Sequence, residues 1–191
     1  MFDFGGGTLD LAVAEVGGAA APRILATRGV LVGGDDLDSR IMQSLFRHFG
    51  ADSRTLDDRP FPAQVLECLL TWQTMPELTR PYYRGLLADL KRTSTQPRAV
   101  GALETLVSRN LGYRLFTEIE RVKKVLSTQT AARLDFEYGD IRIHRLITRG
   151  QFEAMIAAGR VLLGGNHARG YRGDFSPNYI VAVRPLGPRD V

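Results

Sequence analysis

Cysteine, long apolar runs and clustered charge are all scarce in this chain of 191 residues. The one cysteine, Cys68, has no partner for an intrachain disulfide, which predicts a cytoplasmic location. No run of about 18 apolar residues is present, and the first residues lack the charged and apolar regions of a secretion signal. We therefore expect neither secretion nor a membrane partner.

Charge is nearly balanced and dispersed along the chain. There are 25 Lys and Arg against 21 Asp and Glu, a formal net charge of +4. The basic residues do not gather with aromatic residues in one segment, so we expect no nucleic-acid partner. Apolar residues make up 44% and charged residues 24%, which is typical of a soluble globular protein. The length suits one domain or part of a larger one.

The most informative stretch is residues 1–10, MFDFGGGTLD. Its apolar residues predict two strands, one around Phe2 and Phe4 and one over Leu9–Val16, joined by a tight turn. Glycine permits positive φ and close backbone approach, so the amides of such a turn can converge on an anion. Asp3 and Asp10 flank the turn, which consists of Gly5, Gly6, Gly7 and Thr8.

This pattern suits polyphosphate chemistry. The amides can hold phosphates, and the Thr8 hydroxyl can reach a terminal phosphate oxygen. Asp3 and Asp10 can hold Mg²⁺ through its water ligands or orient an attacking water. An ordinary glycine hairpin is the alternative for the glycines alone, but the two flanking acids favour the phosphate site.

A third strand, Arg23–Arg28, is expected after a turn over 17–22, and the loop that follows ends in Gly33 and Gly34. Asp35 or Asp36 then caps a predicted helix. The helix carries one apolar stripe, formed by Leu37, Ile41, Leu45 and Phe49. A capped helix after a glycine loop also explains these residues without any ligand, so both interpretations stay open here.

Residues 51–64 are polar and contain prolines, which indicates a loop. Helical periodicity then covers Val65–Leu90, with breaks at Pro76 and Pro81, and a further helix is expected from Pro97 to about Asn110. Three aromatic residues of this region are interpreted as helix packing, with a partner surface as the alternative: Trp72, Tyr82 and Tyr83.

A strong helix is predicted over Leu115–Leu126. Spacings of three, four and seven bring four polar residues to one face: Glu120, Lys123, Lys124 and Ser127. A carboxylate, two long cations and a hydroxyl can bind the ribose and base of an adenosine. The alternative is a solvated helix with ordinary Glu–Lys pairs.

A hairpin is expected next, Ala132–Tyr138 followed by Ile141–Leu146. Thr148 and Gln151 then match a capping box, which predicts the start of another helix.

Four strings together resemble the heat-shock protein 70 (DnaK-type) chaperone family of actin-like ATPases: FDFGGGTLD, GGDDLDSRI, IERVKKVLS and LITRGQFEAMI. They occur in the family's order over residues 1–156. The long helical connection resembles the divergent YegD-type branch. The resemblance implies an α/β fold, the second lobe of an actin-like (ribonuclease H-like) ATPase with a helical insertion.

The resemblance also implies cofactors and roles. ATP or ADP with Mg²⁺ would be bound, with Asp3, Thr8 and Asp10 serving catalysis. The other nucleotide-binding positions would be Gly5, Gly6, Gly7, Gly33, Gly34, Glu120, Lys123, Lys124 and Ser127. Lys124 stands where the family usually has arginine, which predicts weaker or altered purine binding. Client proteins and co-chaperones would be the partners.

Four regions are expected: the phosphate-binding hairpin, strand pair and helix (1–50), the helical insertion (51–114), the adenosine-side helix and hairpin (115–156), and a tail unlike the family (157–191). The family places another lobe with a catalytic lysine before the hairpin. We therefore expect an incomplete lobe with exposed apolar patches and little or no turnover. We hypothesise that a frameshift near residue 157 produced the tail.

Three other interpretations stay open. The insertion 65–110 could dock a partner without nucleotide. The chain could be a decayed gene product. Another actin-like ATPase, such as a sugar kinase, a phosphatase or a filament protein, would not be expected to combine GGDDLDSRI, IERVKKVLS and ITRGQFEAM.

Overall fold

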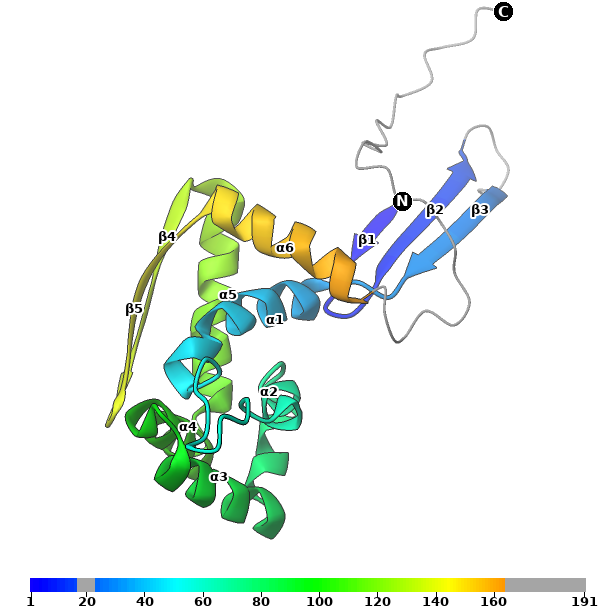
Figure 1. Ribbon diagram of the computed structural model, residues 1–191. Coiled ribbons are helices and arrows are strands. Elements are labelled where there is room, and N and C mark those ends of the chain that lie inside the picture. Colours follow the sequence, from blue (N-terminus) through cyan, green and yellow to red (C-terminus); the bar gives the residue numbers. More distant parts are fainter. Residues whose placement is uncertain (17–22, 164–191) are drawn as a thin grey trace, which may run out of the picture.

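The computed structural model describes residues 1–16 and 23–163 (Figure 1). This part of the chain forms six α-helices, two short 3-10 helices and two small antiparallel sheets. The expected mixed α/β composition is confirmed. None of the helices in this part is both long enough and apolar enough to cross a bilayer.

The first sheet has the order β1–β2–β3 and consists of β1 (Phe2–Phe4), β2 (Leu9–Glu15) and β3 (Arg23–Val30). All three strands were predicted. β3 extends two residues beyond Arg28, because Gly29 pairs with Asp10 and Val30 with Leu9. The predicted turn over 17–22 lies outside the described residues.

This sheet is poorly covered. Its apolar side chains contribute nothing to the buried core of the described residues, and four of them are more than half exposed: Phe2, Val13, Ile24 and Leu25. The outer edges of β1 and β3 have no strand partner within the described ranges. The expected exposed apolar surface and open strand edges are therefore present.

Helix α1 (Gly34–Leu45) continues into the 3-10 helix η1 (Phe46–Phe49), and Gly50 ends it with a φ of 91°. The predicted stripe is confirmed, since Ile41, Leu45 and Phe49 are fully buried. The predicted cap, Asp35 or Asp36, was two or three residues late. Gly33 is the N-cap, and the Asp36 carboxylate accepts a hydrogen bond from its N–H at 2.8 Å.

The insertion folds onto the same core. It contains α2 (Ala63–Cys68), the 3-10 helix η2 (Met75–Thr79), α3 (Pro81–Thr93) and α4 (Pro97–Ser108). The expected breaks in the helical stretch occur. The first break is longer than Pro76 alone predicts, because residues 69–74 form a turn between α2 and η2. One apolar cluster unites α1, the insertion helices, α5, the second hairpin and α6.

Helix α5 (Gly112–Thr128) leads into β4 (Ala131–Tyr138) and β5 (Ile141–Thr148), which form the predicted hairpin. Alternate residues of both strands are buried, so one face of the hairpin packs against α5, as Figure 1 shows. The turn uses Gly139 at a φ of 55°.

Helix α6 (Arg149–Leu163) runs beside α1 (Figure 1). The predicted capping box is confirmed: the Gln151 N–H donates to Thr148 Oγ1 at 3.2 Å, and the Thr148 N–H donates to Gln151 Oε1 at 3.0 Å. The helix continues to Leu163, so the first residues of the region 157–191, which we expected to differ from the family, are helical. The remainder of the tail lies outside the described residues.

Candidate functional site

The glycine turn is bonded to the start of α1. The N–H groups of Gly34 and Asp35 donate to the carbonyl oxygens of Gly5 and Gly6 at 3.0 and 2.7 Å. Gly33 lies so close to the turn that a Cβ there would sit 2.2 Å from the Gly6 oxygen. The residue at 33 must therefore be glycine for reasons of space, since its φ of −145° is open to any residue.

The turn keeps amides available for an anion. The Gly5 N–H donates to the Thr8 carbonyl at 2.8 Å, which closes the turn, while no group in the described residues accepts from the N–H of Gly6 or Gly7. None of the three turn glycines has positive φ, so their expected left-handed freedom is not used. A Cβ on Gly7 would meet nothing within 4 Å, which leaves room for a ligand.

Asp3 and Asp10 are directly opposite each other on β1 and β2. Opposed residues of an antiparallel pair share one face of the sheet, with Cβ atoms about 5 Å apart, and two like charges there repel. A hydrated Mg²⁺ beside one or two carboxylates relieves that repulsion, and this donor set fits the preference of Mg²⁺. The described residues contain no group of three or more His, Cys, Asp or Glu side chains that could hold a metal directly.

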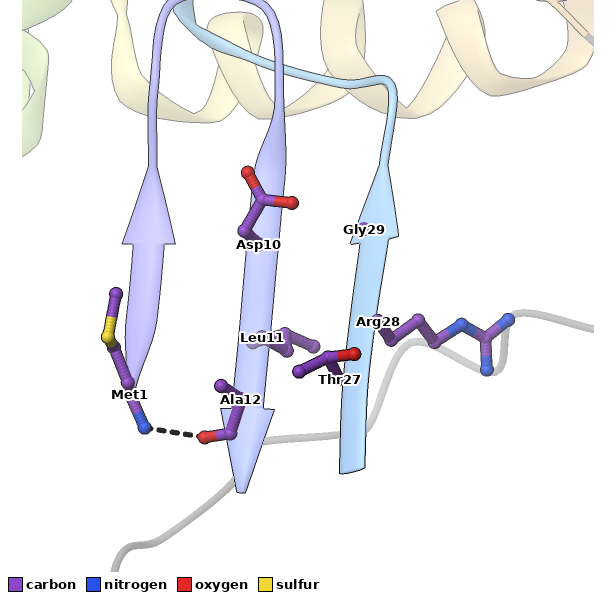
Figure 2. Close-up of a pocket in the computed structure, with 7 residues that line it drawn as sticks. All are labelled: Met1, Asp10, Leu11, Ala12, Thr27, Arg28 and Gly29. Carbon is purple, nitrogen blue, oxygen red and sulfur yellow. Dashed lines mark hydrogen bonds between the residues drawn. The ribbon is translucent and has the colours of Figure 1, made fainter. Parts of the chain in front are cut away.

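A small hollow of about 270 Å³ lies beside Asp10 on this sheet (Figure 2). Asp10 shares it with Gly29 of β3, where a Cβ would lie 2.8 Å from Asp10 Oδ1. The amino group of Met1 donates to the Ala12 carbonyl at 2.7 Å and closes the other end. The hollow is too small for a whole nucleotide.

A larger pocket of about 570 Å³ lies where the glycine turn, α1, the insertion and α5 meet. Its volume is within the usual range for small-molecule sites. Four segments line it: Phe4, Gly5 and Gly6; Gly34, Asp35, Leu37 and Asp38; Thr71, Trp72 and Gln73; and Tyr113, Phe116, Thr117, Glu120, Lys123, Lys124 and Ser127.

Lys123 joins two walls of this pocket. Its Nζ donates to Asp38 Oδ2 at 2.8 Å and to the Gly34 carbonyl at 3.1 Å. The second carboxylate oxygen of Asp38 is buried and has no hydrogen-bond partner in the described residues. Burial raises the pKa of Asp38, and the bond from Lys123 opposes that shift.

Glu120 and Lys124 form a more exposed pair on the same face of α5. Their charged groups lie 2.8 Å apart, and the bond from Lys124 lowers the pKa of Glu120. The Ser127 hydroxyl donates to the Lys124 carbonyl at 2.6 Å, within the helix. The solvated Glu–Lys pair that explained these residues without a ligand therefore exists, and it lies at the rim of the pocket.

The pocket gathers some predicted residues and leaves others apart. Gly5, Gly6 and Gly34 line it together with all four predicted residues of α5: Glu120, Lys123, Lys124 and Ser127. The remaining predicted residues do not line it: Asp3, Gly7, Thr8, Asp10 and Gly33. Of these, Asp3, Gly7, Thr8 and Asp10 are exposed on the turn and the adjoining strands, whereas Gly33 is buried beneath the turn.

Sequence reasoning missed Asp38, Trp72 and Tyr113. Asp38 stands four residues after Gly34, so both fall on one side of α1. Trp72 was interpreted as helix packing, but it lies in the turn between α2 and η2, is 43% exposed and lines the pocket. The signal for Trp72 was its setting among polar residues, TWQT, where a core tryptophan would have apolar neighbours.

Comparison of the chain with models of known protein families finds no match, and comparison with curated proteins finds none. The family resemblance therefore depends on the four sequence strings and on what their residues do in this structure.

Proposed function

We propose that this chain is a nucleotide-binding part of a heat-shock protein 70-like chaperone ATPase, the second lobe of an actin-like fold with a helical insertion. The observation that carries the proposal is the pocket of about 570 Å³. It brings together three segments distant in sequence, the glycine turn, the start of α1 and the polar face of α5, and each contains one of the resemblance strings.

The phosphates of ATP or ADP would lie against the turn, where the amides of Gly6 and Gly7 are open. Asp3 and Asp10 would hold a hydrated Mg²⁺, which neutralises phosphate charge when bound. The Glu120 carboxylate would accept from ribose hydroxyls. Thr8 would contact a terminal phosphate oxygen.

We expect binding with little or no hydrolysis. Phosphoryl transfer requires charge stabilisation around the transferred group, and Asp3, Thr8 and Asp10 are all exposed on a sheet with uncovered faces. In the family, the facing lobe supplies the remaining groups. Handling of client proteins would belong to the whole two-lobe protein in the cytoplasm.

The packing of the insertion weighs against an independent interaction module. Val65, Leu69 and Leu103 are fully buried in the same cluster as Ile41 and Leu45 of α1. Removing the insertion would therefore uncover the wall of the pocket. This packing supports a role for the insertion in the lobe itself.

Calorimetric titration of the full chain with MgADP tests the proposal. We expect saturable binding that weakens about tenfold in Gly7→Ala, because the methyl group would occupy the open space at the turn amides. Asp10→Asn should weaken binding with Mg²⁺ but leave binding in EDTA unchanged. Gly150→Ala is a matched control, since a Cβ there also meets nothing within 4 Å and the residue lies outside the pocket.

Two results would contradict the proposal. The first is the absence of nucleotide binding by a folded chain. The second is binding that Gly7→Ala and Asp10→Asn leave unchanged, which would place the ligand elsewhere. Mg²⁺-dependent ATP hydrolysis lost in Asp10→Asn would keep the family proposal and overturn the expected inactivity.

A further inference from the structure

The end of the pocket formed by the insertion is aromatic. The rings of Trp72 and Tyr113 meet edge to face, with centroids 5.5 Å apart and planes at 80°. Trp72 is 43% exposed and Tyr113 66% exposed. The carboxamide of the neighbouring Gln73 has no hydrogen-bond partner in the described residues, and it also lines the pocket. A flat apolar surface thus stands beside an unused donor and acceptor.

The distance from this end to the glycine turn suits a nucleotide. Lys123 contacts Gly34 beside the turn, and Tyr113 lies ten residues earlier on α5, about 15 Å along the helix axis. Glu120 lies between them, one turn from Lys123. An extended nucleotide can therefore keep its phosphates at the turn and its ribose beside Glu120, while its base reaches Trp72.

The opposite end of the pocket, at Lys124 and Ser127, provides fewer contacts for the base. Ser127 bonds its own helix and Lys124 pairs with Glu120. A lysine ammonium is a compact charge and provides no plane on which a base can stack. An exposed indole does provide one, and base–aromatic stacking is among the stronger contacts available to a nucleotide base.

We infer that the nucleotide base stacks on Trp72 of the insertion, with Gln73 reading its edge, and that it does not lie at Ser127. The inference rests on the proposed nucleotide-binding function and names the base subsite within it. A carboxamide offers one acceptor and donors, which match the amino group and ring nitrogen of adenine, whereas guanine presents two acceptors on the same edge. Adenine is therefore the favoured base.

The test uses Trp72 as its own reporter, because it is the single tryptophan of the chain. The full chain is titrated with MgADP and, separately, with magnesium tripolyphosphate, by calorimetry and by tryptophan fluorescence. We expect both ligands to bind, and ADP alone to quench the fluorescence. Free N-acetyltryptophanamide corrects for absorption by the nucleotide.

Substitutions separate the two ends of the pocket. Trp72→Leu should weaken ADP binding about tenfold and should leave tripolyphosphate binding unchanged. Gln73→Leu should reduce the preference for ADP over GDP, and Ser127→Ala should have no effect. Tyr82→Leu is the matched control, an exposed aromatic residue outside the pocket.

The outcomes distinguish the inference from the proposed function. ADP binding without quenching, unaffected by Trp72→Leu and weakened by Ser127→Ala, overturns the inference and leaves the proposed function standing. If neither ADP nor tripolyphosphate binds to the folded chain, both are overturned. If Trp72→Leu does not fold, two other measurements decide the inference. These are the quenching of tryptophan fluorescence by ADP in the parent chain and the preference of Gln73→Leu for ADP over GDP.

Discussion

Lys123 and Asp38 connect two helices that line the pocket, α5 and α1. The ammonium of Lys123 on α5 lies 2.8 Å from Asp38 Oδ2 on α1, and both side chains are largely shielded from water, at 19% and 10% exposure. The same ammonium donates to the Gly34 carbonyl at the start of α1. Because the glycine turn is bonded to that start, one side chain aligns α5, α1 and the turn.

Replacing Lys123 with methionine should lower the free energy of unfolding by about 3 kcal/mol at neutral pH, because Asp38 would be left as a shielded, unpaired charge. Burial raises the pKa of Asp38 in the folded state. Ionising this carboxyl group therefore lowers the free energy of unfolding as pH rises through that pKa. Denaturant unfolding at several pH values should therefore show a smaller loss in acid and a larger loss near neutrality.

Lys124→Met is the control for that substitution. Lys124 pairs with Glu120, but the two side chains are 71% and 47% exposed, and pairs of this kind contribute about 0–1 kcal/mol. Equal losses in the two variants, or a Lys123→Met loss that does not change with pH, would contradict the assigned role of the Asp38 pair.

The glycine at position 33 is predicted to be indispensable for docking the first sheet. In Gly33→Ala the new Cβ would lie 2.2 Å from the Gly6 oxygen and 2.5 Å from the Gly7 nitrogen, both backbone atoms. The turn would have to move, at a cost of about 1–3 kcal/mol. Hydrogen exchange should show faster exchange of the Gly34 and Asp35 amides, which bond the turn.

Gly7→Ala provides the comparison, because a Cβ at position 7 meets nothing within 4 Å. Its stability should lie within about 0.5 kcal/mol of the parent. If both variants exchange alike at Gly34 and Asp35, close packing of the turn on α1 is not what holds the sheet.

Periodic features of the fold were predictable from the sequence. The stripe of α1 follows from apolar residues four apart, of which Ile41 and Leu45 are fully buried, and the second hairpin follows from alternation in strands such as β4. The helix α6 was signalled by the spacing of Thr148 and Gln151. In each case residues near in sequence decide the outcome, so a local pattern suffices.

The site depended on contacts that no local pattern contains. Gly33 is needed because of Gly6, and Lys123 finds its partner Asp38 85 positions away. Trp72 was taken for a packing residue because periodicity cannot tell whether an aromatic side chain meets the core or a pocket. Sequence strings identified the segments of the site, whereas their relative positions required the tertiary structure.

His144 on the second hairpin should titrate above its ordinary pKa. Its ring nitrogens lie 2.8 Å from Asp135 Oδ1 and 2.7 Å from Glu137 Oε1, and both carboxylates raise the pKa of His144 above 6.5. Its contribution to stability is therefore full below pH 6.5 and is lost as pH rises through the raised pKa. The pKa of Asp135 is lowered by the same contact, so acid removes its contribution as pH falls through that lowered pKa.

Proton NMR titration of the histidine side chains checks this expectation, with His48 as an internal control. Burial lowers the pKa of His48, so the two residues should titrate on opposite sides of pH 6.5. Asp135→Asn should lower the pKa of His144 and leave that of His48 unchanged. An unchanged His144 in that variant would show that the carboxylate contact does not exist in solution.

The capping box of α6 gives the last prediction. Thr148→Ala removes the side-chain oxygen that accepts from the Gln151 N–H, so a donor in the first turn loses its partner. We expect the free energy of unfolding, measured by urea denaturation, to fall by about 1 kcal/mol. Thr93→Ala is the matched control, because the Thr93 hydroxyl donates to the Asp89 carbonyl four residues earlier in α3 and accepts from no N–H group of a helix N-terminus. Since α6 packs on α1, the loss of stability should extend to the pocket. Equal stability of the two variants would contradict the assigned role of the capping box.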